Sequence, residues 1–279
     1  MSYKIVVDSC GDLSSEMKSS GVFVSVPIMI TLGDKEIRDD ETFVQAEFLK
    51  MMAESPHTPK SSCPSPEEFL QYYQGDEERI YVVTLSSELS GTYNSAVLAK
   101  ELYLEKYSGK SIHIFNSRSA CAGESAIAYV VWQCELAGMS FEKIVETVEA
   151  YIEEQHTYFV LENLDVVRKS GRLTGVKSIV ASALNIKPVM GSTPEGTIQQ
   201  LGQGRGINRA LKKMADLIVS DVVNPEGRIL AICHCNCLER AEELRKLILE
   251  KIKVKGSFIV DTAGVGTMYA NDGGIVVAL

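Results

Sequence analysis

Two serine-rich loops carry the side chains best suited to binding a ligand. The first is Ser61-Ser-Cys-Pro-Ser, directly before an expected helix, and the second is Leu85-Ser-Ser-Glu-Leu-Ser-Gly-Thr-Tyr-Asn-Ser-Ala, between a strand and a helix. Both place hydroxyl groups beside helix N-termini, where unpaired N–H groups and the positive dipole end favour an anion. Short neutral hydroxyls suit a carboxylate better than a phosphate. Ser61, Ser62 and Ser90 are therefore candidate ligand-binding residues, against the alternative that they only cap helices.

An enzyme that uses Ser90, either a phosphotransferase or an acyl hydrolase, is the competing interpretation. A serine nucleophile needs a general base, and neither loop contains a histidine. The sequence also lacks the Gly-x-Ser-x-Gly elbow of hydrolases and a phosphate-binding loop that ends in Gly-Lys-Ser/Thr. We assign no catalytic residue and expect a binding protein.

Cys233-His-Cys-Asn-Cys is the one cluster that resembles a metal site. On a strand its three cysteines would share one face. Zinc motifs, however, separate paired cysteines by two to four residues and need a second ligand pair elsewhere. We therefore expect a strand that runs into a helix, with metal-free thiols at Cys233, Cys235 and Cys237, and no cofactor.

The charge and hydropathy of the chain exclude several partners. Its 279 residues include 28 Lys and Arg against 37 Asp and Glu, for a formal net charge of −9. Nucleic-acid binders and proteins of anionic membranes need basic surfaces, so neither partner is expected. The longest apolar stretch, near Ala126 to Trp132, is far too short for stable membrane insertion. With no signal-peptide pattern, we expect a cytoplasmic protein with free thiols.

The order of expected elements indicates an α/β protein with two domains. Strands alternate with helices in the first half, including a helix over about 92–107, which is typical of a parallel, Rossmann-like sheet. The second half contains an antiparallel hairpin around Thr193-Pro-Glu-Gly-Thr and further strands, which predict a mixed or antiparallel sheet. We place the boundary near residue 155, giving domains 1–155 and 156–279.

Several helices and extended segments can be predicted with their residue bounds. Ser65 is expected to cap a helix that has Pro66 first and Glu68 in a capping box. Residues 22–32 read as an extended region ending in a hairpin turn at Leu32-Gly, 43–52 as a helix, and about 176–184 as another helix.

Several blocks of the chain, in order, resemble the DegV family of bacterial fatty-acid-binding proteins. The block Leu85 to Ala96 is similar to the most specific family motif, Leu-Ser-Ser-x-Leu-Ser-Gly-Thr-Tyr-x-Ser-Ala. The other similar blocks are Asp8-Ser-Cys-Gly-Asp-Leu, Ser61-Ser-Cys-Pro-Ser, Asn116-Ser-Arg-Ser, Ser170-Gly-Arg-Leu, Asn185-Ile-Lys-Pro-Val and the helix start at Arg205.

The resemblance implies a two-domain fold with a long-chain fatty acid buried between the domains. Its carboxylate would be held by hydroxyls matching Ser61, Ser62 and Ser90, and its tail would occupy an apolar tunnel. Arg172 and Arg205 would lie near the ligand mouth or the partner surface. Some family members present the acid to a separate ATP-dependent, DhaL-like fatty acid kinase, so the resemblance implies a non-catalytic carrier with that kinase as a partner.

One stretch departs from the family pattern. Many members carry His-x-Gly-Pro-Gly near the C-terminus, with the histidine at the carboxylate, whereas this chain reads Asp261-Thr-Ala-Gly-Val-Gly. At this position Thr262 is expected to supply a hydrogen-bond donor to the carboxylate in place of the histidine, although it lacks the imidazole ring. This difference bears on delivery to a kinase more than on fatty-acid binding.

Overall fold

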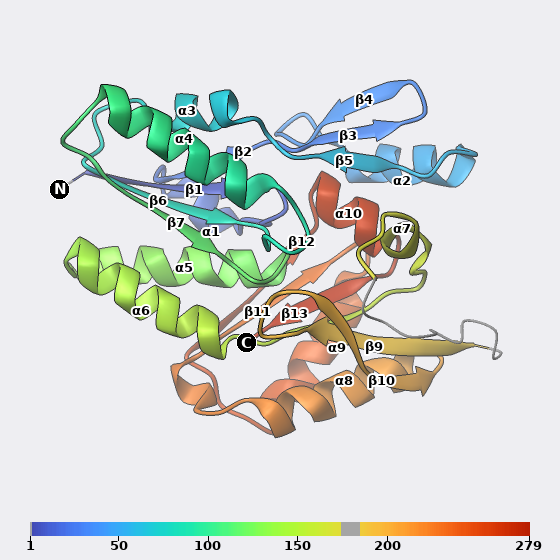
Figure 1. The fold of residues 1–279 in the computed structure, drawn as a ribbon. Coiled ribbons are helices and arrows are strands. Elements are labelled where there is room, and N and C mark those ends of the chain that lie inside the picture. The colour runs from blue at the N-terminus through green and yellow to red at the C-terminus, as the bar shows by residue number, and fades with distance from the viewer. Residues whose placement is uncertain (1, 174–184) are drawn as a thin grey trace.

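The computed structural model describes residues 2–173 and 185–279, which fold into three β-sheets and the helices around them (Figure 1). All neighbouring strands of the first sheet are parallel. In spatial order they are β2 (Phe23–Val26), β1 (Tyr3–Asp8), β6 (Arg79–Thr84) and β7 (Ser111–Asn116). Their β-branched runs are buried on both faces, as parallel strands require.

Helices cover both faces of this sheet. Val6 of β1 packs on the side of α3 (Pro66–Tyr73) and α4 (Thr92–Lys106). Ile5 and Val7 point the opposite way and pack with α5 and α6. These two helices are Ala122–Leu136 and Phe141–Glu154, and α1 (Ser15–Ser19) adds Met17 to the same cluster. The alternation of side chains along a strand thus separates two apolar cores.

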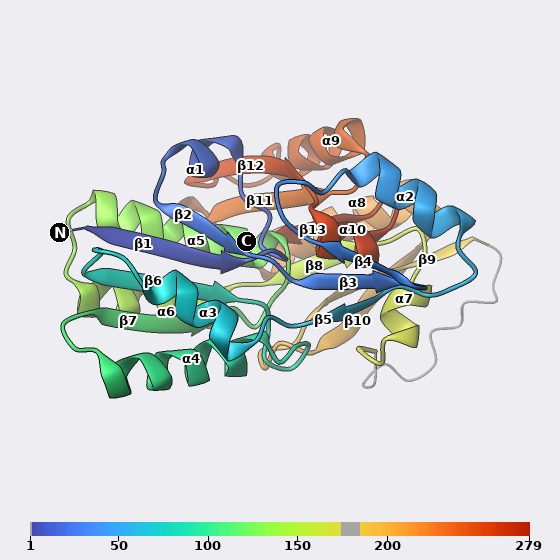
Figure 2. The same cartoon turned by 90° about the horizontal axis from the view of Figure 1, so that it is seen from above.

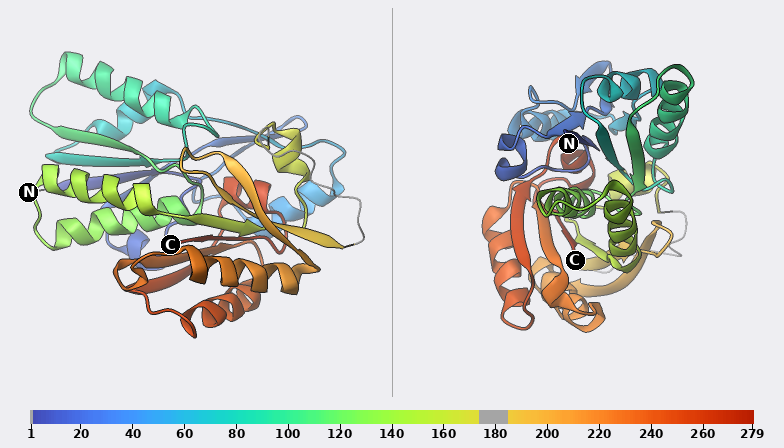
Figure 3. Two further views of the ribbon diagram at one scale, coloured as in Figure 1. Left: turned by 60° about the horizontal axis from the view of Figure 1, so that its bottom comes forward. Right: turned by 90° about the vertical axis from the view of Figure 1, so that its left-hand side faces the viewer.

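The second sheet is mixed. Its six strands are, in spatial order, β10 (Ile198–Arg205), β9 (Ile186–Ser192), β8 (Thr157–Val160), β13 (Ile275–Ala278), β11 (Ile229–His234) and β12 (Gly256–Asp261). Every pair is antiparallel except β11 with β12. One face is covered by α8 (Ile207–Asp221) and α9 (Leu238–Leu249), while α5 packs against the other and separates the two sheets (Figure 3).

A third, small sheet extends from the first half and contacts the second. Its order is β4 (Lys35–Arg38), β3 (Met29–Leu32) and β5 (Lys60–Ser62), and α2 (Gln45–Glu54) accompanies it. Seen from above, these elements lie beside α10 (Gly264–Ala270) (Figure 2). The remaining elements are α7 (Asp165–Lys169) and a 3₁₀ turn at Pro225–Gly227.

The expected fold class is confirmed: one parallel sheet, one mixed sheet and surrounding helices. The Ser65 capping box and the hairpin turn after Leu32 are also present. The extended region expected over 22–32 is present as two strands, β2 and β3, which belong to different sheets and are separated by Pro27 and Ile28. The helix expected over 43–52 begins at Gln45, and the one expected at 176–184 lies outside the described residues.

The strands of the first sheet precede residue 155 and those of the second follow it, but the domain boundary itself stays a prediction. Within the described residues, no helix is long and apolar enough to cross a membrane.

Candidate ligand cavity

A cavity of about 320 Å³ opens where the carboxyl ends of the first sheet meet the second sheet and α10. Cavities that hold small organic ligands typically measure roughly 300–1,000 Å³. Most of its walls are apolar. The apolar lining residues are Ile28, Leu85, Leu89, Ala120, Phe159, Leu161, Val167, Ile198, Val265, Ala270 and Val276. These side chains come from both halves of the chain, so the cavity exists only when the two halves are packed together.

All three serines expected at a carboxylate site belong to the lining. Ser61 and Ser62 are successive residues of β5, and their side chains therefore point to opposite faces of that strand. Ser61 is half-buried, and its Oγ lies 3.3 Å from the hydroxyl of Tyr269, whereas Ser62 is exposed. Ser61 is thus the better-placed donor of the pair.

Ser90 lies at the start of α4, directly before the N-cap residue Gly91. Its Oγ accepts a hydrogen bond from the Thr92 backbone N–H at 3.3 Å and lies 2.9 Å from Thr92 Oγ1. Gly91 makes no side-chain cap, so N–H groups of the first helical turn are left for a ligand. A Cβ at Gly91 would lie 3.2 Å from Cys63 Sγ, which shows how closely backbone and loop approach here.

Two arginines are the charged members of the lining among the described residues. Arg172 donates from Nε to the Leu89 carbonyl at 3.1 Å and from Nη1 to the Ser170 carbonyl at 2.8 Å. Arg118 lies in the loop after β7. With no Asp, Glu, Lys or His among the described lining residues, the cavity favours an anionic group at its polar end.

Tyr269 is a lining residue that sequence reasoning missed. It lies on α10, and its hydroxyl contacts Ser61 across 208 positions of sequence. The stretch 261–266 differs from the family pattern by its missing histidine, but nothing local in the sequence marks the tyrosine that follows as a cavity residue. Only the packing of α10 beside β5 brings the two hydroxyls together.

Two buried carboxylates of the first half hold the start of α10. Asp39 accepts hydrogen bonds from the N–H groups of Gly264 at 2.6 Å and Val265 at 2.8 Å, and Asp12 accepts from Ala263 at 2.6 Å. Burial raises the pKa of the Asp12 carboxyl to about 8 and also raises the pKa of Asp39. The wall that carries Tyr269 is therefore fixed by polar contacts between the two halves.

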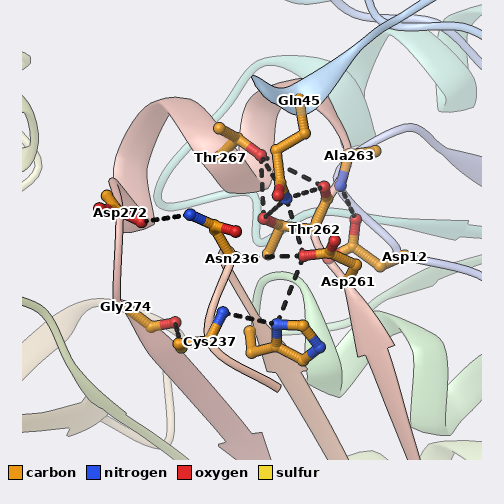
Figure 4. Close-up of polar contacts among 11 residues, drawn as sticks. Asp12, Gln45, Asn236, Cys237, Asp261, Thr262, Ala263, Thr267, Asp272 and Gly274 are labelled. Carbon is orange, nitrogen blue, oxygen red and sulfur yellow. Dashed lines mark hydrogen bonds and ion pairs between the residues drawn. The ribbon is translucent and has the colours of Figure 1, made fainter. Parts of the chain in front are cut away.

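Thr262 and Arg205, the other two residues expected at the ligand, do not belong to the lining. Thr262 is buried in a polar network, where its Oγ1 lies 2.9 Å from Thr267 Oγ1 and accepts from Gln45 Nε2 at 3.2 Å (Figure 4). Arg205 is exposed at the end of β10. A ligand contact from either residue stays a prediction.

The cysteines near the cavity are free thiols. Cys10 and Cys121 both line it, with their Sγ atoms 3.8 Å apart, and burial contributes to a raised pKa of each thiol. Cys233 is buried in β11, and Cys237 occupies the N-cap position of α9 without a side-chain capping bond, so the strand-to-helix interpretation of that cluster is confirmed. Among residues 2–173 and 185–279, no group of three or more His, Cys, Asp or Glu side chains forms a potential metal site.

Comparisons with known proteins agree along the whole chain. The model of the family described as "Uncharacterised protein, DegV family" matches residues 2–279. A DegV domain-containing protein of Streptococcus pyogenes serotype M18 is 32% identical over 282 residues, which cover 99% of this chain and 98% of that protein.

Two solved structures are similar to this fold. A DegV family protein from Ruminococcus gnavus ATCC 29149, refined with vaccenic acid, has a TM-score of 0.97 and 60% identity, and both chains are covered completely. The Fatty Acid Kinase (Fak) B3 protein of Streptococcus pneumoniae, loaded with linoleic acid, has a TM-score of 0.89 and 29% identity, over 100% of this chain and 99% of that one.

Proposed function

This chain belongs to the DegV family, and from that premise we propose that it binds a long-chain fatty acid in the cavity between its two sheets. The observation that carries the proposal is the cavity itself, whose walls are mostly apolar and whose polar lining is rich in hydroxyls, without acidic groups among the described residues. The two similar structures hold vaccenic and linoleic acid, which are ligands of this chemical kind.

The apolar walls supply most of the binding free energy. A sixteen-carbon acid buries about fifteen methylenes at about 0.8 kcal/mol each, on the order of 12 kcal/mol before the costs of ordering. Loss of ligand freedom removes several kcal/mol, so we expect a dissociation constant between about 1 nM and 1 µM. Ser61 and Ser90 would then fix the orientation of the carboxylate, with Ser62 as a more exposed third donor, and the first turn of α4 would complement its charge.

We further propose that the protein is a carrier without catalysis of its own. A serine nucleophile needs a base, and the described lining residues include no His, Asp, Glu or Lys. Similarity to the pneumococcal Fatty Acid Kinase B3 protein supports presentation of the bound acid to a kinase in the cytoplasm. Domains 1–155 and 156–279 would then enclose the acid from its two sides.

Organic extraction of the purified protein, followed by mass spectrometry, tests the proposal. We expect about one intact, unmodified fatty acid per chain, and none from a control protein purified in the same way. After delipidation, the protein should rebind a C16 or C18 acid with the affinity given above. Extracts without fatty acid, together with no rebinding, would contradict the proposal, and a hydrolysed or phosphorylated product would favour the enzyme.

A further inference from the structure

We infer that the phenolic hydroxyl of Tyr269 is a direct donor to the ligand carboxylate, opposite Ser61, so that both halves of the molecule hold the head group. The inference rests on the proposed function, because it names a binding residue of the same cavity. Ser61 belongs to β5 in the first half and Tyr269 to α10 in the second, and both line the cavity.

The contact between the two hydroxyls leaves a proton for a ligand. Ser61 Oγ and the Tyr269 oxygen lie 3.3 Å apart, which is longer than the roughly 2.7–2.8 Å usual for a hydroxyl pair. Each hydroxyl carries one proton, and their mutual contact uses only one of the two. Within the described residues, Ser61 is the one hydrogen-bond partner of the Tyr269 hydroxyl. A carboxylate oxygen placed between them can accept from both.

The position of Tyr269 is set before any ligand arrives. Asp39 and Asp12 hold the N–H groups at the start of its helix, as Figure 4 shows for Asp12 and Ala263. The tyrosine ring packs against a cluster that contains Leu161, Val167 and Ala270. A donor that is already held in place needs little ordering when the anion binds, which makes its hydrogen bond more effective.

The chemistry of the cavity end favours a phenol in this role. A tyrosine hydroxyl, with an ordinary pKa of about 10, is a stronger acid than a serine alcohol and so a stronger donor to an anion. The described lining contains no carboxylate that would compete for this proton. Ser90 and the first turn of α4 belong to the same lining. Tyr269, Ser61 and Ser90 are therefore hydroxyl donors of one cavity.

The test compares Tyr269→Phe with wild type in binding of a C16 fatty acid and of the C16 alcohol, using delipidated protein. Removing a hydrogen bond to a charged group should weaken acid binding about 10- to 100-fold. Alcohol binding should change less than about threefold, because the tail and ring contacts remain. Tyr129→Phe is the matched control: Tyr129 packs on Trp132 and Phe258, lies outside the cavity lining, and should change neither affinity.

The outcomes separate this inference from the proposed function. If wild-type protein binds neither ligand, the proposed function fails. The inference fails if wild type binds the acid and Tyr269→Phe binds it equally well. It also fails if Tyr269→Phe loses affinity for the acid and for the alcohol to the same extent, because Tyr269 is then only part of the cavity wall. A double-mutant cycle with Ser61→Ala should show coupling for the acid and none for the alcohol, and melting temperatures will show whether each variant remains folded.

Discussion

The Ser90 hydroxyl is a proposed ligand donor that also forms a hydrogen bond within the fold. Its oxygen accepts from the Thr92 N–H, but the N-cap position of α4 is occupied by Gly91. Ser65, by contrast, has no role in the lining and forms both bonds of a capping box with Glu68. The two serines therefore provide a direct comparison of ligand binding with helix capping.

We expect Ser90→Ala to weaken fatty-acid binding about 10- to 100-fold, because one charge-assisted hydrogen bond is lost. Its melting temperature should stay close to that of wild type. Ser65→Ala should show the reverse, with a loss of about 1 kcal/mol in the free energy of unfolding and unchanged affinity. Ligand titration and thermal melting of both delipidated variants check this. Normal affinity in Ser90→Ala would remove Ser90 from the carboxylate site.

The β9–β10 hairpin joins the two halves at one side of the cavity. Its turn is closed by Thr193 and Thr197, whose Oγ1 atoms lie 2.9 Å apart. At its tip, the Gly196 carbonyl accepts a hydrogen bond from Ser86 Oγ at 2.9 Å. Gly196 has φ +95°, and a Cβ there would lie 2.4 Å from Ser86 Oγ and 2.8 Å from the Arg118 Cα. Only glycine adopts this positive φ without strain and also leaves room for Ser86 and Arg118.

Gly196→Ala should therefore lower the free energy of unfolding by about 2–5 kcal/mol, from the positive φ and from overpacking together. Because Gly196 lines the cavity, fatty-acid affinity should fall as well. Gly138→Ala is the control: Gly138 has φ +72°, with nothing within 4 Å of an added Cβ. It should lose only about 1–2 kcal/mol and keep its affinity. Denaturant unfolding measures both variants, and equal losses would show that packing at the tip contributes nothing.

The sequence predicts those elements that depend on residues close together in the chain better than those that depend on distant residues. The Ser65 capping box, the Thr193–Thr197 turn and the alternation of strands and helices depend on neighbours in sequence, and each was expected correctly. The assignment of β2 and β3 to different sheets depends on distant strands, so it was missed. Tyr269 was missed for the same reason, since its partner is 208 positions away.

At the scale of the whole molecule, buried acidic side chains of the first half link stability to pH. Burial raises the pKa of Asp8 to about 6 and of Asp12 to about 8, and burial together with the nearby Asp8 charge raises that of Glu124 well above its ordinary value. Between about pH 4 and pH 8 these carboxyls bind more protons in the folded protein than in the unfolded chain. Their contribution to stability therefore falls as the pH rises through this range.

We expect the melting temperature to decrease between pH 5 and pH 8. Asp12→Asn keeps an oxygen for the Ala263 N–H and removes the ionisation, so its melting temperature should depend less on pH over this range. Asp40→Asn is the control, since hydrogen bonds from Thr42 lower the pKa of this half-buried carboxyl and its effect belongs below a pH of about 4. A melting temperature that rises from pH 5 to pH 8 would contradict the assignment.

The hydrogen bonds from the N–H groups of residues 263–265 to Asp12 and Asp39 have a consequence for biosynthesis. Both carboxylates leave the ribosome more than two hundred residues before the N–H groups that they accept from. Strand β13 is likewise translated after β8 and β11, between which it lies. A nascent chain that has made only the first sheet therefore lacks α10 and the inner strand of the second. On the proposed function, a fatty acid can be loaded only after both have been translated.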